Sequence, residues 1–308
     1  MFTIIKPGTK IDFVGKMRMA AIASVITVII CAILVVTKMN YGVDFRGGAE
    51  IEVKTKQRLS LDEIRQSLEK SGLKGVTLQT IGDEAENEVL LKVQADPHEL
   101  NVVAAGVEKT MRTDFANAGV EIRKVDVVGA KAGKQLRVSA FLAMCWAFIS
   151  VMIYLGLRFD FRYAPGVVVS LVHDTAIVLG IYALFGFEFS LQTVAAILAV
   201  IGYSLNDTVI VYDRVREHEH KYPGVDLLTL INNATNETLS RTIVTSGATL
   251  MVTVLMYLLG GGAIKDFFFA FSVGIVFGTY SSIYVASAFT YELDVFQKWR
   301  KARAKQTA

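Results

Sequence analysis

Apolar residues dominate six stretches of the chain, each long enough to cross a bilayer as a helix. The first covers residues 19–37 and contains no charge, so at 1.5 Å per residue it extends about 28 Å, close to the thickness of a hydrocarbon core. The other five expected spans are residues 138–157, 163–187, 191–212, 242–264 and 267–291. The pattern therefore predicts a polytopic α-helical membrane protein.

Residues 38–136, between the first two spans, follow a different pattern. Residues 49–54 alternate apolar with charged side chains, which is typical of a strand with one buried face. Two amphipathic helical patterns and three further strand patterns follow. In the last of these, residues 120–128, the alternation slips around Lys124 and predicts a bulge. The order β-α-β-β-α-β predicts an α+β domain of the ferredoxin-like type, inserted between the first and second membrane helices.

Charge placement predicts the orientation of the chain. Hydrophobic residues make up 53% of the sequence and charged residues 20%, with a net charge of +3. Lys and Arg gather in one set of short loops, whereas the opposite short loops carry only Lys265. By the positive-inside rule, residues 1–18 and the basic tail 292–308 are expected in the cytoplasm, and residues 38–136 on the far, periplasmic side. The basic clusters lie at residues 6–18, 158–162, 214–241 and 298–305.

The composition gives no indication of a cofactor or a catalytic centre. Cys31 and Cys145 both fall inside apolar spans, where they act as small hydrophobic residues and predict neither a disulfide nor a metal site. The sequence contains no nucleophile–base arrangement, metal-ligand spacing or phosphate-binding glycine loop in a polar context. We therefore expect a chain that is not an enzyme, needs no cofactor and binds no nucleic acid.

Asp207 is the most informative residue because it lies inside an apolar span. Membrane burial disfavours the ionised form of a carboxyl group, and a proton carrier needs that property. Arg241 opens the next, antiparallel span, and its long side chain can reach inward to pair with Asp207 or stay at the interface. The hypothesis is that this pair alternates between two states. A positive-inside anchor role for Arg241, and an interhelical hydrogen-bond role for Asp207, are the alternatives.

Four more polar residues of the third and fourth spans are candidates for a proton pathway. His173 and Asp174 lie near the middle of the third span, and an imidazole beside a carboxyl group can extend a proton relay. Neighbours on a helix point about 100° apart, so we expect these two not to face one partner. Ser204 and Asn206 can orient Asp207 or bind water. For all four, an ordinary role in helix contacts is the alternative.

Three shorter signals concern connections and packing. Residues 225–239 predict a short helix in a cytoplasmic loop, either interfacial or packed against the bundle. The pair Gly274 and Gly278 predicts close helix approach, within the bundle or against a partner. Asp44 with the Gly47-Gly48 pair predicts a turn between the first helix and the first strand.

Several motifs resemble the SecF family, subunits of the bacterial SecDF complex of the protein translocase and members of the resistance-nodulation-division superfamily. Tyr41-Gly42-Val43-Asp44-Phe45-Arg46-Gly47-Gly48 is similar to the family's Asp-Phe-x-Gly-Gly signature, with arginine where threonine is more usual. The sequence Val172-His173-Asp174 resembles the His-Asp motif of the third span. Residues 201–209 and the trailing residues 213–217 resemble the fourth-span signature, and residues 239–242 resemble the Ser-Arg-Thr that follows it.

The resemblance implies a function, whereas the spacing and periodicity of residues in this sequence do not indicate one. It implies an accessory subunit in the inner membrane that works with SecD, YajC and the SecYEG translocon, and that uses proton motive force to promote translocation of unfolded polypeptide. A non-transporting scaffold subunit and one half of a small-molecule exporter are the alternatives.

Overall fold

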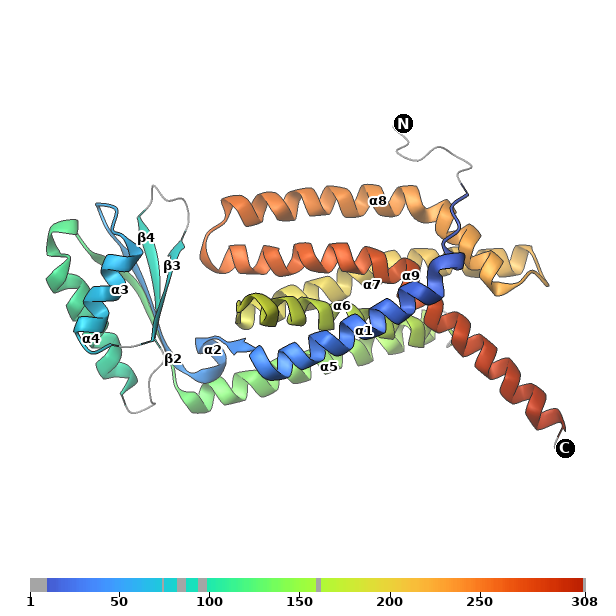
Figure 1. Cartoon of the computed structure of the whole chain (residues 1–308), viewed down its shortest axis with the longest axis horizontal. Helices are drawn as coiled ribbons and strands as arrows, with labels where there is room; N and C mark the ends of the chain where they lie inside the picture. The colour runs from blue at the N-terminus through green and yellow to red at the C-terminus, as the bar shows by residue number, and fades with distance from the viewer. Residues whose placement is uncertain (1–9, 74, 82–86, 94–98, 159–161, 307–308) are drawn as a thin grey trace.

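The chain is described by a computed structural model covering residues 10–73, 75–81, 87–93, 99–158 and 162–306. Six of its helices are long and apolar enough to cross a membrane. They form a bundle with a sheet-containing unit at one end, and the described chain begins and ends at the opposite end (Figure 1). The six helices are α1 (Val14–Lys38), α5 (Ala130–Arg158), α6 (Ala164–Phe185), α7 (Leu191–Lys221), α8 (Leu227–Leu259) and α9 (Gly262–Gln306).

Most of these helices extend beyond the apolar runs that predict them. Helix α7 continues to Lys221, and α9 continues through the basic tail to Gln306. The short helix expected at residues 225–239 is not a separate element, because α8 runs without a break from Leu227. Its first turns are packed into the bundle, with Leu230 only 3% exposed. Packing thus favours one continuous helix over an interfacial segment.

The start of α8 also holds the chain that precedes α1. Asn236 Oδ1 accepts from the Ile11 amide at 2.8 Å, and Asn236 Nδ2 donates to the Ile11 carbonyl at 2.8 Å. Asn232 Oδ1 accepts from the Phe13 amide at 2.9 Å. These side-chain amides therefore fix the entry into the first membrane helix.

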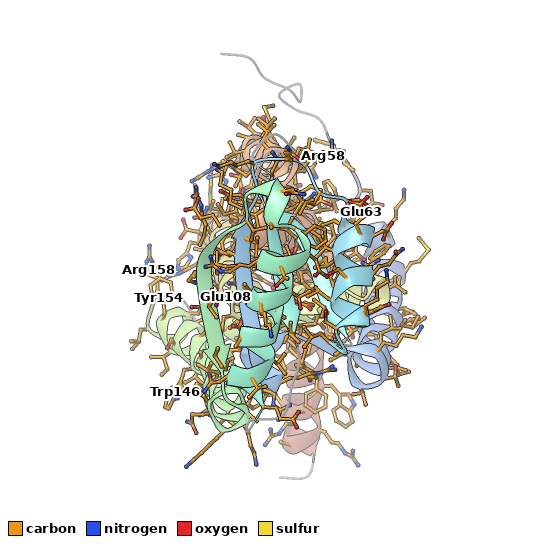
Figure 2. The ribbon with its side chains drawn as sticks, turned by 90° about the vertical axis from the view of Figure 1, so that its left-hand side faces the viewer. Arg58, Glu63, Glu108, Trp146, Tyr154 and Arg158 are labelled. Carbon is orange, nitrogen blue, oxygen red and sulfur yellow. The ribbon has the colours of Figure 1, made fainter. Side chains whose placement is uncertain are left out.

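The unit between α1 and α5 contains a four-stranded antiparallel sheet. Its strand order is β3-β4-β2-β5, and two helices cover the face turned away from the bundle (Figure 1). Viewed from that outer side, α3 and α4 lie in front of the sheet, with Glu63 and Glu108 on them (Figure 2). The elements are β2 (Gly48–Lys54), α3 (Leu61–Lys70), β3 (Val76–Ile81), β4 (Glu88–Val93), α4 (Leu100–Asp114), a short 3-10 turn (Ala116–Ala118) and β5 (Glu121–Val128).

The predicted order of strands and helices in this unit is confirmed. Ile51 of β2 and Leu91 of β4 are fully buried beneath α3 and α4, in one core cluster with Met111 of α4. In the β2–β5 pair, Glu52 pairs with Lys124 and Val53 with Ile122, so one residue of β5 is left over. The bulge therefore lies beside Lys124, as the slip in alternation predicts.

A compact junction links the sheet unit to the bundle. The expected turn at Asp44 contains a one-turn helix, α2 (Val43–Arg46), preceded by β1 (Asn40–Tyr41). Strand β1 pairs in parallel with β6 (Glu188–Phe189), between α6 and α7. Asp44 Oδ2 accepts from the Leu191 amide at 2.9 Å, which caps the first turn of α7. Gly48 has φ +153°, and a Cβ there would lie 2.3 Å from the Val93 carbonyl oxygen, so glycine is required.

An ion pair reinforces this junction. Lys92 Nζ lies 2.7 Å from Glu188 Oε2 in the bundle and 3.5 Å from Glu50 Oε1 in the sheet. Burial acts to lower the pKa of Lys92, but the two carboxylates more than offset it, so the pKa is raised above the ordinary lysine value. Burial also raises the pKa of Glu50, and Lys92 opposes that shift. The charge on Lys92 therefore joins the two parts of the molecule.

Candidate site of buried carboxyl groups in the bundle

Asp207 lies on α7 in the interior of the bundle, with 5% of its surface exposed. Its Oδ1 accepts from Thr242 Oγ1 of α8 at 2.6 Å, and its Oδ2 accepts from Ser282 Oγ of α9 at 2.8 Å. Three helices therefore meet at this carboxyl group. The two hydroxyls satisfy both oxygens of the carboxyl group.

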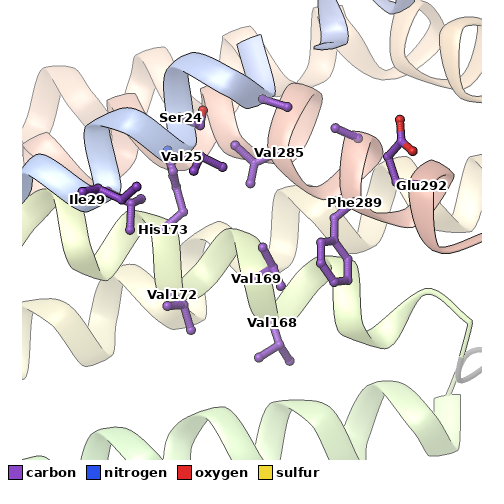
Figure 3. Close-up of a pocket in the computed structure, with 13 residues that line it drawn as sticks. Ser24, Val25, Ile29, Val168, Val169, Val172, His173, Val285, Phe289 and Glu292 are labelled. Carbon is purple, nitrogen blue, oxygen red and sulfur yellow. The ribbon is translucent and has the colours of Figure 1, made fainter. Parts of the chain in front are cut away.

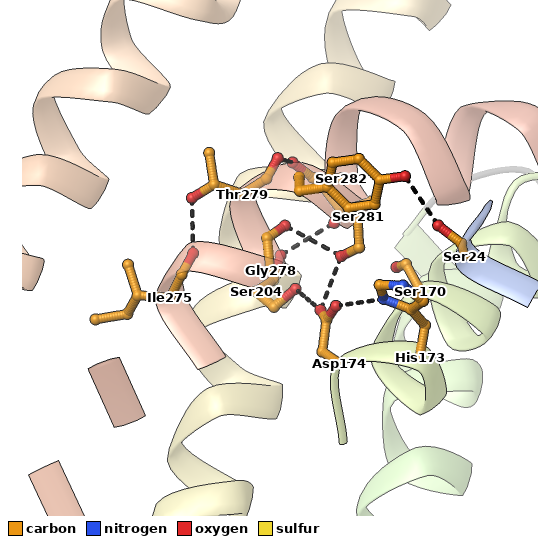
Figure 4. A network of polar contacts seen from close by, with 12 residues as sticks. Ser24, Ser170, His173, Asp174, Ser204, Ile275, Gly278, Thr279, Ser281 and Ser282 are labelled. Atoms are coloured by element: carbon orange, nitrogen blue, oxygen red, sulfur yellow. Dashed lines mark hydrogen bonds and ion pairs between the residues drawn. The ribbon is translucent and has the colours of Figure 1, made fainter. Parts of the chain in front are cut away.

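Asp174 lies on α6 and is fully buried. Its Oδ2 accepts from Ser204 Oγ of α7 at 2.7 Å and from Ser281 Oγ of α9 at 2.8 Å, and its Oδ1 lies 3.0 Å from His173 Nδ1 (Figure 4). The neighbours His173 and Asp174 thus contact each other, whereas their helical positions alone predict divergent directions. Three helices converge on this second carboxyl group as well.

Two glycines let α9 approach the helices that carry the carboxyl groups. A Cβ on Gly278 would lie 3.1 Å from Ser204 Oγ and 3.5 Å from Asp174 Oδ2, and a Cβ on Gly274 would lie 2.1 Å from Val200 Cγ2 of α7. The predicted Gly-x-x-x-Gly contact therefore lies within the bundle, against α7. Close approach brings the serines of α9 within hydrogen-bond distance of both carboxyl groups.

His173 also lines an open, mainly apolar groove of about 420 Å³ between α1, α6 and α9. Valine and isoleucine side chains form most of its wall, and Glu292 lies at one end (Figure 3). The His173 side chain is 4% exposed, and within the described part of the chain its Nε2 has no hydrogen-bond partner. The His173 ring therefore lies between the Asp174 carboxyl group and this groove.

The remaining candidates make no hydrogen bond to the Asp207 side chain among the described residues, although the charge of Arg241 acts on it. Arg241 is exposed, and across the described ranges no ion pair joins it to Asp207; the adjacent Thr242 makes the contact instead. Consecutive helical residues point about 100° apart, so Arg241 faces outward while Thr242 faces Asp207. Asn206 is also exposed. Ser204 is buried, but it donates to Asp174 rather than to Asp207.

Sequence reasoning missed three hydroxyl residues as partners of the carboxyl groups: Thr242, Ser281 and Ser282. Thr242 stands out in the sequence only as part of the Ser-Arg-Thr stretch, and the two serines lie within the sixth span. A usable signal does exist in the run Thr279-Tyr280-Ser281-Ser282, four hydroxyl residues in the middle of an apolar span. Such a run in a membrane helix predicts a polar partner on a neighbouring helix.

The fold and the site together define a class of protein. Six helices can span a membrane, and two of them carry buried carboxyl groups that hydroxyls from other helices satisfy. Ionisable groups inside a membrane bundle mark ion or proton pathways in many transport proteins. The chain is therefore a multi-pass membrane protein with an intramembrane polar centre.

Comparison with known families identifies the family. The family model described as "Protein export membrane protein SecD/SecF, C-terminal" matches residues 107–295, and the "SecD/SecF GG Motif" matches residues 32–57. The protein translocase subunit SecF of Calditerrivibrio nitroreducens is 36% identical over 96% of this chain and 98% of its own length. SecF of Magnetococcus marinus is 38% identical over 93% of both chains. The chain belongs to the SecF family of protein translocase subunits.

Solved structures show the same arrangement of elements. The crystal structure of SecDF from Thermus thermophilus, described as a translocon-associated membrane protein, matches 94% of this chain with a TM-score of 0.80 and 32% identity. A SecDF structure in a "super-membrane-facing form" matches all of it with a TM-score of 0.71 and 31% identity. This chain spans only 39% and 41% of those two chains, so it corresponds to one part of a longer SecDF chain.

Proposed function

We propose that this chain is the SecF half of a SecDF-type complex that uses proton motive force to promote the export of unfolded proteins. In this proposal it pairs with SecD, and the pair acts with YajC and the SecYEG translocon in the bacterial inner membrane. Both termini lie in the cytoplasm. The sheet unit is a ferredoxin-like periplasmic domain, an assignment supported by its strand order and by its position at the end of the bundle opposite the termini.

The observation that carries the proposal is the hydroxyl coordination of Asp207. A serine or threonine hydroxyl both donates and accepts hydrogen bonds, so Thr242 and Ser282 can satisfy the carboxyl group with or without its proton. A fixed cation at the same place would hold Asp207 ionised. A site built from hydroxyls therefore suits a group that repeatedly binds and releases a proton.

In this proposal Asp207 has a second, ionised state, which Arg241 stabilises. It is exposed, and it directly precedes the Thr242 that contacts Asp207. When the long Arg241 side chain reaches inward, its guanidinium replaces the Thr242 hydroxyl at Asp207 and stabilises the ionised carboxylate. Asp174, held by Ser204 and Ser281, serves as a second proton-binding group, with His173 as its partner.

The gradient supplies enough energy for such a change. One charge that crosses a potential of about 100 mV releases about 2.3 kcal/mol, which shifts a two-state equilibrium roughly fifty-fold. Both carboxyl groups are bonded to α9, so their proton occupancy can be transmitted to the packing of that helix. In this proposal the energy comes from the gradient, and the chain itself catalyses no reaction.

Asp207→Asn tests the proposal, because asparagine keeps the size of the side chain and can bond the same hydroxyls but has no titratable proton. The variant is co-expressed with its SecD-type partner in cells, and export is measured in inverted inner-membrane vesicles prepared from them. We expect the ATP-driven phase of export to persist and the gradient-dependent phase to be lost. Asn206→Ala, which changes the exposed neighbour, should behave as wild type in both phases.

The scaffold alternative predicts a different result. Hydrogen bonds between helices stabilise membrane bundles whether or not a proton moves, so the contacts of Asp207 are also compatible with a purely structural role. If Asp207→Asn assembles in normal amounts and keeps wild-type gradient-dependent export, the proton-carrier role is excluded and the scaffold role is retained.

A further inference from the structure

The final part of α9 leaves the bundle with large apolar side chains exposed. Helix α9 runs to Gln306, and its last turns extend obliquely away from the other helices (Figure 1). Val295 is 41% exposed, Phe296 56% and Trp299 54%. Because α9 is itself a membrane-length helix, its continuation emerges at the bilayer surface.

These exposed residues share one face of the helix. At 100° per residue, Val295, Phe296, Trp299 and Ala302 fall within an arc of about 120°, the width of an amphipathic apolar stripe. The Phe296 and Trp299 rings stack with centroids 6.1 Å apart. The apolar face is thus an ordered aromatic surface that none of the other described elements covers.

The opposite face is basic. Residues 295–306 contain five Lys or Arg and no Asp or Glu. Lys298 pairs with Asp294 at 2.7 Å. Arg303 instead lies within the apolar arc, with its guanidinium 5.3 Å from the Trp299 ring centroid. Arg300 and Lys301 are exposed, and within the described residues they form no ion pair, so their charges are directed to the surroundings.

We propose that residues 295–306 form an interfacial helix that binds anionic phospholipid headgroups beside the last membrane span. Phe296 and Trp299 enter the boundary between headgroups and acyl chains, while Arg300 and Lys301 bind lipid phosphates. Three observations select lipid over a soluble protein: the aromatic stripe with a basic opposite face is the pattern of membrane-surface helices, tryptophan favours this interface, and the segment is continuous with a membrane helix. Long basic side chains can reach the headgroups while their stems remain apolar.

This binding site has a consequence for the bundle and does not depend on proton coupling. Ser281 and Ser282 lie on the same continuous helix as the tail. Adhesion of the tail to the membrane surface fixes the tilt and rotation of α9 at one end. The lipid composition of that leaflet thereby acts on the helix that contacts both buried carboxyl groups.

The sequence provides the probe, because Trp146 and Trp299 are its two tryptophans. The full chain with Trp146→Phe is reconstituted in vesicles of phosphatidylcholine with or without phosphatidylglycerol. In the anionic vesicles we expect a blue-shifted Trp299 emission, quenching by lipids brominated near the headgroup, and protection from aqueous acrylamide. Salt at about 1 M, where the Debye length is near 3 Å, should reverse the effect of the anionic lipid.

Two variants separate the charge contribution from the apolar one. Arg300→Gln with Lys301→Gln should weaken partition of the tail about fivefold for each cation removed, and Phe296→Gln should weaken it in both kinds of vesicle. The control is Trp299→Phe, which leaves Trp146 as the remaining tryptophan. Trp146 lies within the membrane helix α5, so its emission should respond to neither lipid charge nor salt. Equal acrylamide access to Trp299 in both vesicles would overturn the proposal. If Trp299 is protected from acrylamide only after soluble protein is added, the lipid proposal is wrong and the tail binds a protein partner.

Discussion

Ser281 and Ser282 are neighbours on α9, yet they donate to different carboxyl groups. Ser281 Oγ lies 2.8 Å from Asp174 Oδ2, and Ser282 Oγ lies 2.8 Å from Asp207 Oδ2. Because consecutive helical side chains diverge by about 100°, one turn of α9 reaches both α6 and α7. The two carboxyl groups are therefore coupled through one rigid element while each keeps its own hydroxyls.

The first prediction concerns the independence of these two contacts. In a double-mutant cycle on the free energy of unfolding, Ser282→Ala and Asp207→Ala, each of which removes the contact, should couple by about 0.5–1.5 kcal/mol, the range for a hydrogen bond between membrane helices. Ser281→Ala with Asp207→Ala is the matched control and should be additive. Equal coupling for both serines would contradict the assignment of one serine to each carboxyl group.

The second prediction separates the structural and proton-binding roles of Asp174. Asp174→Ala leaves the buried Ser204 and His173 without their acceptor, and leaves Ser281 only its bond to the Gly278 carbonyl at 3.1 Å. Each unsatisfied group costs about 1–3 kcal/mol. We therefore expect low yield of that variant in the membrane. Asp174→Asn retains an acceptor oxygen and should restore the yield. If Asn also restores gradient-dependent export to the wild-type rate, Asp174 is a structural residue.

The hydropathy pattern predicts the membrane helices well but not their ends. The end of α7 beyond residue 212 and the first turns of α8 are polar or mixed, and hydropathy therefore excludes them. They are helical because Val215, Leu230 and Ile231 pack into the interior. A sliding apolar window reports contact with lipid, whereas the length of a helix also depends on contacts between helices.

The carboxyl groups of the site were predictable, but their hydroxyl partners were not. A charged residue in an apolar span is conspicuous because its burial costs so much. Serine and threonine are common in membrane helices, and the contact from Ser282 to Asp207 joins residues 75 positions apart. Only the packing of α9 against α7, which Gly274 and Gly278 permit, decides which hydroxyls meet which carboxyl group.

The third prediction tests those glycines. A Cβ on Gly274 would overlap the stiff, β-branched Val200 side chain, so Gly274→Ala should separate α9 from α7 and lower the free energy of unfolding by about 1–3 kcal/mol. Gly247→Ala on α8 is the control, because a Cβ at that position would have no atom of a neighbouring element within 4 Å. Helix propensity makes that change neutral or stabilising by up to about 1 kcal/mol. Similar destabilisation by both variants would contradict the close-approach argument.

The fourth prediction concerns the ion pair between the sheet unit and the bundle. The Lys92 and Glu188 side chains are 9% and 15% exposed, and Lys92→Met leaves two carboxylates without their cation. Breaking a buried pair costs roughly 3–5 kcal/mol, and the partial exposure of Glu188 favours the lower end. Thermal unfolding and limited proteolysis at the junction should both report the loss. Lys54→Met is the matched control, since Lys54 pairs within the sheet and Glu88 keeps Arg123.

The same ion pair predicts a pH dependence with a definite sign. Because the pKa of Lys92 is raised in the folded protein, its stabilisation is complete below the ordinary lysine pKa of about 10.4 and is lost as the pH rises through the folded-state value. The pKa of Glu50 is also raised, so its burial destabilises the ionised form and the stability attributable to Glu50 falls as the pH rises through the acid range. Between these two titrations, attachment of the sheet unit should not change with pH. If the sheet unit of the wild-type chain is released near neutral pH, another group holds the junction. The same follows if Lys92→Met releases the sheet unit at the same alkaline pH as the wild-type chain.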